Sequence, residues 1–210
     1  MTTTKDMKLS ISEASTHDVF NCLSSLPAYS KILLDNTEAK SYTEFLRWLL
    51  EKNFYNDSQE KVSLKKMAAE VNSDSVKLGR WIKQIYTAIF ELNEQSPDLF
   101  QQGGLKVTLY MRYFDRACNF SVAVPLLPRE FESFSFFFVN VVMDVHHFWV
   151  KRIVHEIGSE TAIALEGGYL NRYREFALEK ALFQGRLGLM DVVKKDSFEI
   201  DKELKTIYRD

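Results

Sequence analysis

The chain has 210 residues, of which 46% are hydrophobic and 27% charged, a composition typical of a globular protein with one large domain or two small ones. Its longest apolar run, residues 134–143, is shorter than the roughly 20 residues of a membrane-spanning helix, and the N-terminus lacks the apolar core of a signal peptide. Two cysteines, Cys22 and Cys118, do not make a disulfide framework, so we expect free thiols in a reducing, cytoplasmic compartment without membrane contact.

The formal net charge of −2 hides an uneven distribution along the chain. Residues 61–90 hold six basic and two acidic side chains, a balance of +4, so the other 180 residues sum to −6. A basic segment in an acidic chain indicates an anionic partner. The charged residues of this segment are Lys61, Lys65, Lys66, Lys77, Arg80 and Lys83 against Glu70 and Asp74.

The N-terminal part of the chain is predicted to be helical after a polar start. Residues 1–10 are polar and are expected to lack regular structure. A helix is predicted over residues 16–34, with an interruption at Pro27 because proline lacks a backbone donor and clashes with the preceding turn. Ser41 and Glu44 predict a capping box at the start of the next helix, in which each side chain accepts a bond from the other residue's backbone amide.

That next helix is predicted over residues 42–54, and two more are predicted over 63–71 and 75–92. Ala68 is small enough for two helices to cross closely, and Asn72 tolerates the left-handed backbone of a tight turn between them. The apolar residues on either side of the turn are expected to form a shared core. These are Met67 and Val71 before the turn and Leu78, Trp81 and Ile82 after it.

In this pattern, residues 41–92 resemble the helix-turn-helix DNA-binding domains of bacterial regulators. The resemblance implies that the second helix of the pair lies in the major groove of double-stranded DNA. Lys77, Arg80 and Gln84 recur at helical spacing and share one face of that helix, with Ser75 and Lys83 near its edges. Lys65 and Lys66, at the front of the first helix, are expected to contact phosphates. These seven residues are the predicted DNA-binding site.

After Gly103–Gly104 the apolar period changes from helical to two, which predicts strands. The expected strands cover residues 105–113, 120–124, 133–142, 146–157 and 161–166, with a tight turn at Gly158–Ser159. Basic residues of the first hairpin, Lys106, Arg112 and Arg116, either form a wing that touches DNA or belong to the solvated face of the sheet.

Two final helices are predicted over residues 171–184, with Asn171 as the N-cap and Gly185 as the stop, and over 197–208. The order of helices, strands and helices predicts an α+β fold whose sheet is antiparallel or a small barrel. The predicted divisions are an N-terminal segment (1–40), a helix-turn-helix-like domain (41–102), a β region (103–168) and C-terminal helices packed on the sheet (169–210).

The aromatic run over residues 131–139 would be apolar on both faces if it formed one strand. Such a strand is either central in the core or forms a homodimer interface on its second face. A dimer would suit a helix-turn-helix protein that reads a two-fold symmetric site.

The residue groups that suggest catalysis or metal binding do not fit either chemistry. If residues 146–157 form one strand, His147 and His155 lie about 26 Å apart, too far to share a metal ion, while His146 points to the opposite face. Ser63 and Lys66 have the spacing of some acyl-transfer enzymes without the companion motifs. We therefore predict a non-enzyme without metal or cofactor. It is either a DNA-binding transcription regulator or mobile-element accessory protein, or a non-catalytic interaction or oligomerisation protein whose β-rich half binds a partner or small ligand.

Overall fold

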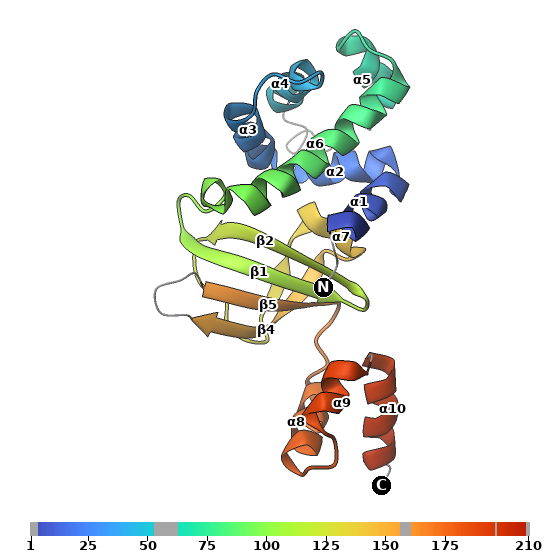
Figure 1. Cartoon of the computed structure of the whole chain (residues 1–210), viewed down its shortest axis with the longest axis vertical. Coiled ribbons are helices and arrows are strands. Elements are labelled where there is room, and N and C mark those ends of the chain that lie inside the picture. Colours follow the sequence, from blue (N-terminus) through green and yellow to red (C-terminus); the bar gives the residue numbers. More distant parts are fainter. Residues whose placement is uncertain (1–3, 53–62, 156–160, 196, 209–210) are drawn as a thin grey trace. The chain divides into compact units, whose positions relative to one another are not determined.

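The structure, a computed structural model, describes residues 4–52, 63–155, 161–195 and 197–208. The chain divides into two compact units, residues 1–168 and 169–210, and this division falls at the boundary predicted after residue 168. The first unit holds a helical region followed by a five-stranded sheet, and the second is helical (Figure 1). The predicted α+β class is therefore confirmed.

The helical region contains more helix at its N-terminus than the sequence suggested. Its elements are α1 (Thr4–Glu13), α2 (Thr16–Ser25), α3 (Pro27–Asn36), α4 (Thr43–Lys52), α5 (Leu64–Glu70), α6 (Ser75–Gln95) and the 3-10 turn η1 (Pro97–Leu99). The expectation that residues 1–10 lack regular structure is wrong for residues 4–10, which belong to α1, and residues 1–3 lie outside the described residues. The same helix buries Ile11 in the core. Pro27 stands in the first turn of α3, where its missing donor costs nothing, so the predicted helix over 16–34 is two helices.

The start of α4 differs from the predicted capping box. Ser41 Oγ lies before the helix and accepts a hydrogen bond from Trp81 Nε1 at 3.2 Å. Thr43 Oγ1 instead accepts from the Lys40 amide at 2.8 Å. The capping-box prediction is wrong because the largely buried Trp81 indole needs an acceptor, and Ser41 supplies it. The predicted end of this helix, after residue 52, lies outside the described residues.

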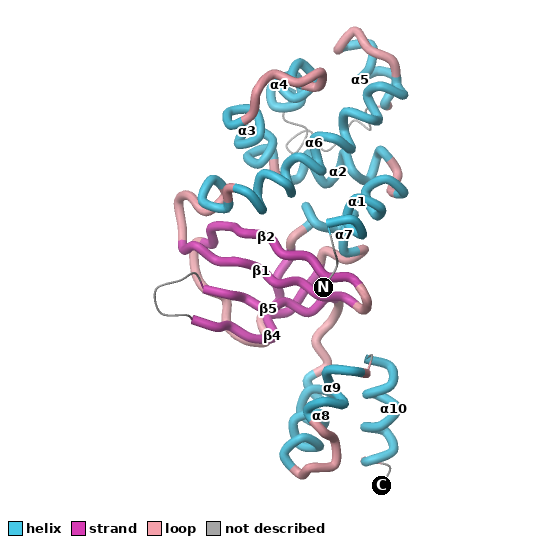
Figure 2. Tube along the Cα trace, viewed as in Figure 1, coloured by secondary structure: helices cyan, strands magenta, loops and turns pink. Residues whose placement is uncertain are grey.

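The sheet is mixed. Its strands are β1 (Leu105–Tyr113), β2 (Arg116–Val124), β3 (Ser133–Ser135), β4 (His147–His155) and β5 (Thr161–Gly167), in the order β2-β1-β5-β4-β3 (Figure 2). The predicted antiparallel arrangement holds for three pairs and is wrong for β1 and β5, which run parallel. The antiparallel pairs β1–β2 and β4–β5 lie side by side, and their adjacent strands β1 and β5 run in the same direction. The predicted turn at Gly158–Ser159 lies outside the described residues.

The predicted long strand over residues 133–142 is also wrong. The chain leaves the sheet after β3 and continues as the 3-10 turn η2 (Phe137–Val139) and the short helix α7 (Asn140–Met143). Phe136 and Phe138 are 7% and 0% exposed in the core. A straight strand would place aromatic rings on two faces, whereas this turn brings them into one core. Of the two alternatives for this run, Phe136 and Phe138 therefore follow the first, because both lie in the core. Nothing supports a homodimer through this run.

One core joins the helices to the sheet in the first unit. Tyr29 of α3, Phe90 of α6, Phe120 of β2 and Phe138 of η2 form a cluster with ring centroids 5.2 to 5.6 Å apart. The predicted divisions after residues 40 and 102 therefore cut through a single core rather than separating compact units.

The second unit consists of α8 (Arg172–Phe183), α9 (Leu189–Lys194) and α10 (Ser197–Ile207). The predicted cap and stop of its first helix are confirmed: Asn171 Oδ1 accepts from the Arg174 amide at 3.1 Å, and Gly185 has a φ of +66°. Its own small core contains Leu178, Ala181, Leu187, Ile200 and Leu204. That these helices pack on the sheet stays a prediction.

Candidate nucleic-acid interface

The turn between α5 and α6 ends the first helix and starts the second within four residues. Asn72 adopts the predicted left-handed conformation, with a φ of +49°. Its amide donates to the Ala69 carbonyl, and the Ser73 amide donates to the Ala68 carbonyl at 2.8 Å. This pair of bonds is the Schellman motif, which satisfies the last carbonyls of a helix and reverses the chain. Asparagine here takes the position that glycine usually occupies.

Both helices are also capped at their N-termini. Ser63 Oγ accepts from the Lys66 amide at 3.3 Å, and Asp74 Oδ1 accepts from the Lys77 amide at 2.8 Å. The second helix is therefore capped by Asp74 and not by either of the serines beside it, Ser73 and Ser75. The bond from the Lys77 amide, assisted by the nearby charges of Arg80 and Lys77, holds the pKa of Asp74 below its ordinary value.

The inner faces of α5 and α6 pack together as the sequence predicts. Met67 and Ala68 of α5 are 0% and 2% exposed. Across from them, α6 buries Leu78, Trp81 and Ile82. Ala68 is therefore buried in the interface of the two helices, where the sequence predicted a small residue.

Hydrogen bonds from two tryptophans, one in α4 and one in α6, connect α4 to this pair. Trp48 Nε1 of α4 donates to Glu70 Oε2 of α5 at 3.1 Å, and Lys52 Nζ lies 3.0 Å from the same oxygen. The hydrogen bonds from Lys52 and Trp48 lower the pKa of Glu70. Trp81 of α6 reaches the start of α4 through Ser41. The three helices α4, α5 and α6 therefore form one connected arrangement, as a tri-helical DNA-binding domain requires.

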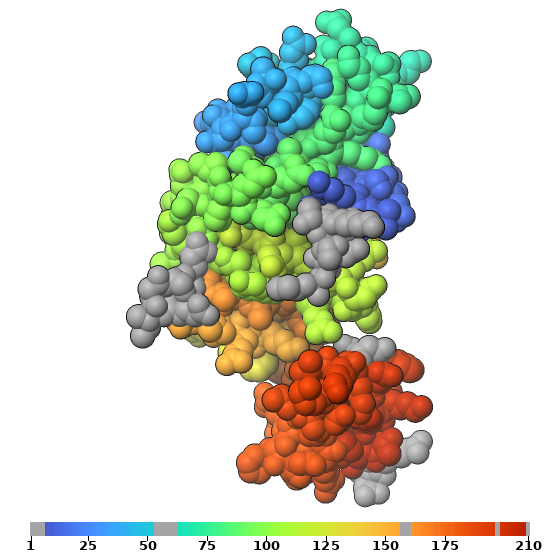
Figure 3. Space-filling model, viewed as in Figure 1, coloured from blue at the N-terminus to red at the C-terminus, as the bar shows by residue number. Residues whose placement is uncertain are grey.

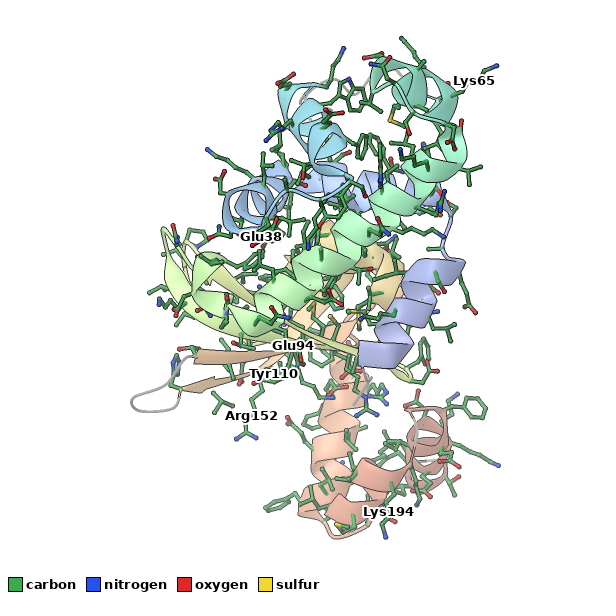
Figure 4. All side chains as sticks on the ribbon, turned by 45° about the horizontal axis from the view of Figure 1, so that its top comes forward. Glu38, Lys65, Glu94, Tyr110, Arg152 and Lys194 are labelled. Atoms are coloured by element: carbon green, nitrogen blue, oxygen red, sulfur yellow. The ribbon has the colours of Figure 1, made fainter. Side chains whose placement is uncertain are left out.

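Five of the seven predicted contact residues lie on α5 and on the first two turns of α6. Lys65, Lys66, Ser75, Lys77 and Arg80 are all exposed. In the space-filling view this part of the chain forms one end of its unit (Figure 3). Lys65 marks that end in Figure 4, with Glu94 near the opposite end of α6. Lys77 Nζ lies 4.9 Å from the centroid of the Trp81 ring, a cation–π contact that restricts its side chain.

Lys83 does not belong to this group. Its Nζ donates to the Ser12 carbonyl of α1 at 2.7 Å, which leaves its charge at the end of that helix. The approach of the N-terminal helices to α6 is close, since a methyl group on Gly79 would lie 3.2 Å from Thr16 Oγ1 of α2. The ion pair of Lys8 and Glu91, with 2.7 Å between Nζ and Oε1, adds a further link between α1 and α6.

Gln84 is exposed but lies in a groove rather than on a protruding surface. The groove has a volume of about 560 Å³ and runs along α6 between α1 and residues 40–42. Its wall on the α1 side includes Ile11 and Ser12. The sequence did not predict this side of the groove, because residues 1–10 are mostly polar. The only signal for the helix that forms it was the helical spacing of the apolar residues Met7 and Ile11.

The basic residues of the first hairpin do not form a wing beside α5. Lys106 Nζ pairs with Asp98 Oδ1 at 2.6 Å, and Arg116 Nη1 donates to the Val142 carbonyl at 3.2 Å. The hairpin of β1 and β2 lies toward the C-terminal end of α6, whereas α5 adjoins its N-terminal end (Figures 1 and 4). The alternative of a solvated sheet face therefore describes Arg112 and its neighbours better.

Other reactive groups are dispersed. Within the described ranges, His, Cys, Asp and Glu side chains form no group of three or more that could hold a metal ion. His147 and His155 stand at the two ends of β4. Both cysteines are free and buried, and burial raises the pKa of the Cys22 thiol to about 11 and that of Cys118 to about 12. None of the helices in the described part of the chain has the length and apolar character needed to cross a membrane.

The chain thus combines an α+β fold with the adjoining helix pair α5 and α6. Comparisons with protein-family models, with curated proteins and with solved structures find no match to this chain. The resemblance to bacterial helix-turn-helix domains stays a prediction that rests on residues 41–92 alone.

Proposed function

We propose that this protein binds double-stranded DNA through α5 and the first two turns of α6. It would act in the cytoplasm as a transcription regulator or a mobile-element accessory protein. The observation that carries the proposal is the turn at Asn72, whose two hydrogen bonds to the Ala68 and Ala69 carbonyls reverse the chain between α5 and α6. Exposed cations of both helices therefore lie near this turn, at one end of the unit (Figure 3). Helix pairs of this kind place their second helix in the major groove.

The side chains at this end have the chemistry that DNA recognition requires. The Arg80 guanidinium can donate two hydrogen bonds to the O6 and N7 atoms of a guanine, and Ser75 can donate to or accept from a base edge or phosphate. Lys65 and Lys66 at the start of α5 are placed for phosphates on one flank, and Lys77 adds charge beside Arg80.

The proposed contact set is narrower than the one predicted from sequence. Lys83 is excluded because its Nζ is bonded to the Ser12 carbonyl. Gln84 lies at the boundary, where the groove beside α1 begins. The DNA-contacting surface of α6 therefore ends near Arg80, about two helical turns from its start.

The experiment compares binding of a fluorescent random duplex at ~50 and ~200 mM salt, with a matched pair of double variants. For roughly four phosphate contacts, wild-type affinity should fall about a hundredfold over this range because counterions are released on binding. Lys77→Ala/Arg80→Ala should weaken binding at both salt concentrations. The control Lys31→Ala/Arg152→Ala removes one exposed lysine and one exposed arginine from α3 and β4, and it should bind like wild type. Equal losses in both variants, or no binding by the folded protein at ~50 mM salt, would contradict the proposal.

The alternative of a small-ligand site in the β-rich half is less well supported. A cavity between α6 and β2, lined by Phe90, Asn93 and Phe120 among others, has a volume of about 220 Å³. Binding sites for small molecules usually measure roughly 300–1,000 Å³. The Asn93 side chain there is already bonded to the Ser121 backbone, so it offers no free polar group to a ligand.

A further inference from the structure

The C-terminal unit exposes more large apolar side chains than it buries. Its core contains five residues, whereas its surface carries aromatic and aliphatic side chains on all three helices and on the segment before them. The exposed group comprises Tyr169, Tyr173, Phe176, Phe183, Leu189, Met190, Val193 and Phe198. A unit of about 40 residues rarely reaches stability through its own core alone, and small domains often gain the missing burial by oligomerisation. The exposed side chains are therefore candidates for an interface.

Three of these side chains form a stripe along α8. Tyr173, Phe176 and Phe183 are 89%, 65% and 93% exposed. At about 100° per residue they fall within about 80° of arc on the helix surface. The buried residues Leu178 and Ala181 lie on the opposite side, facing the core of the unit. α8 therefore packs against its own unit with one face and presents an aromatic face to the exterior.

Charged residues border this stripe in a self-complementary order. Arg172 and Glu179 are both exposed and lie seven residues apart, on the same edge of the stripe. On the other edge, Tyr173 and Lys180 are also seven residues apart. Two copies of α8 packed antiparallel about a two-fold axis bring each edge against the same edge of the partner, with its order reversed.

We propose that a second copy of this chain occupies the stripe, in an antiparallel α8–α8 interface whose two-fold axis passes at Phe176. In that register Arg172 faces Glu179 of the other copy, and the same pair recurs on the far side of the axis. Tyr173 faces Lys180 of the other copy, whose ammonium group would exchange its cation–π contact with Tyr208 of its own chain, at 5.2 Å, for one with Tyr173. Phe176 packs on its own symmetry mate. The midpoint of both sequence pairs falls within one residue of Phe176.

The area available is of the right size for a dimer. Aromatic side chains bury roughly 150–250 Å² each when fully covered, so the three rings supply at most about 450–750 Å² per copy. In this register Phe183 lies opposite the exposed Tyr169 of the other copy. A stable interface needs about 800 Å² per partner, and the flanking Arg172, Glu179 and Lys180 supply the rest. A parallel packing of the same helices would instead place the Arg172–Glu179 edge against the Tyr173–Lys180 edge and lose both pairings.

The test is a charge swap in the full chain, followed by sedimentation equilibrium without DNA. Wild type should be a dimer, and Arg172→Glu and Glu179→Arg should each raise the dimer Kd about tenfold or more, because each sets like charges face to face twice. The double variant Arg172→Glu/Glu179→Arg should restore the dimer, since the reversed order is again complementary. The matched control Lys194→Glu, on α9, should leave the Kd unchanged. Circular dichroism checks that each variant is folded.

Two outcomes would overturn the proposal. A wild-type monomer at all accessible concentrations would do so, and in that case a fall in Tm on Phe176→Glu would assign the stripe to a site within the same chain. A dimer Kd that is unchanged in both single charge-reversal variants would place the interface elsewhere. A double variant whose Kd is not restored would do the same. Because no DNA is present, these results are independent of the proposed DNA binding.

Discussion

The two halves of α6 differ in what surrounds them. The N-terminal half, residues 75–84, exposes Ser75, Lys77 and Arg80. It packs against α5, with α2 beside Gly79 and α1 bonded to Lys83. The C-terminal half, residues 85–95, buries Ile85, Tyr86, Ile89, Phe90 and Asn93, and the Tyr86 hydroxyl donates to the Phe138 carbonyl. The C-terminal half of α6 is therefore packed into the main core, whereas the N-terminal half exposes its charged side chains to solvent.

This difference separates stability from binding along a single helix. Substitutions in the C-terminal half should change the free energy of unfolding strongly and DNA affinity only through folding. Substitutions of exposed residues in the N-terminal half should do the reverse. The following predictions test that separation in order of expected effect.

The largest effect is expected for Ile89→Ala in the C-terminal half. Ile89 is fully buried between the helices and the sheet. Removing its side chain leaves a cavity and should lower the free energy of unfolding by about 2–5 kcal/mol. Urea unfolding followed by circular dichroism measures this change. A change in the free energy of unfolding close to zero would contradict tight packing of the C-terminal half of α6.

The next effect concerns the edge of the sheet. The Asn93 side chain donates to the Ser121 carbonyl at 2.8 Å and accepts from the Ser121 amide at 2.9 Å, which closes the open edge of β2. Asn93→Ala should destabilise the protein by about 2–3 kcal/mol because both buried backbone groups lose their partner. Asn93→Asp retains an acceptor for the Ser121 amide but sets a buried carboxylate against the Ser121 carbonyl, so it should destabilise at least as much as alanine. Amide hydrogen exchange at Ser121 should accelerate in both variants.

A smaller effect is expected at Asn72, in the turn that precedes the N-terminal half of α6. Asn72→Val forces a β-branched residue into a left-handed conformation at a cost of roughly 1–2 kcal/mol. Asn72→Gly should be neutral or stabilising at the same position. If the turn positions the two helices on DNA, valine should also weaken DNA binding beyond its effect on folding. Equal stability of the glycine and valine variants would contradict the left-handed turn.

The smallest predicted effect is pH-dependent. The folded-state pKa of Asp74 is lowered below 3.8, so its contribution to stability is full above that value and is lost as pH falls through the lower, folded-state value. Asp74→Ala should lower Tm by roughly a few degrees at neutral pH, and the difference from wild type should shrink in acid. Asp74→Asn keeps a capping oxygen and should lose the pH dependence while retaining most of the stability. A difference that grows in acid would contradict this assignment.

The sequence predicted those features that depend on local chemistry. The left-handed Asn72, the buried Met67 and Ala68, and the cap at Asn171 each follow from a backbone requirement that few residues meet. The resemblance of residues 41–92 to a helix-turn-helix domain stays a prediction, and DNA binding stays a proposal.

Features that depend on distant contacts were not predictable from the local pattern. The rings of residues 131–139 read as a two-faced strand, yet a 3-10 turn directs Phe138 into the core against Tyr29 and Phe120. Ser41 had the spacing of a cap, yet Trp81, forty residues away, uses its hydroxyl. Lys83 matched the basic face of α6, and only the folded position of α1 brings the Ser12 carbonyl to it.

The measurement that tests the central claim most directly compares Lys77→Ala with Lys83→Ala, two lysine variants six residues apart on the same helix. The quantity is the slope of the logarithm of the DNA-binding constant against the logarithm of salt concentration. Lys77→Ala should make the slope shallower by about 1, because one cation leaves the interface, and Lys83→Ala should leave the slope unchanged. Equal slopes for both variants and wild type, or a change confined to Lys83→Ala, would contradict the proposed interface on the N-terminal half of α6.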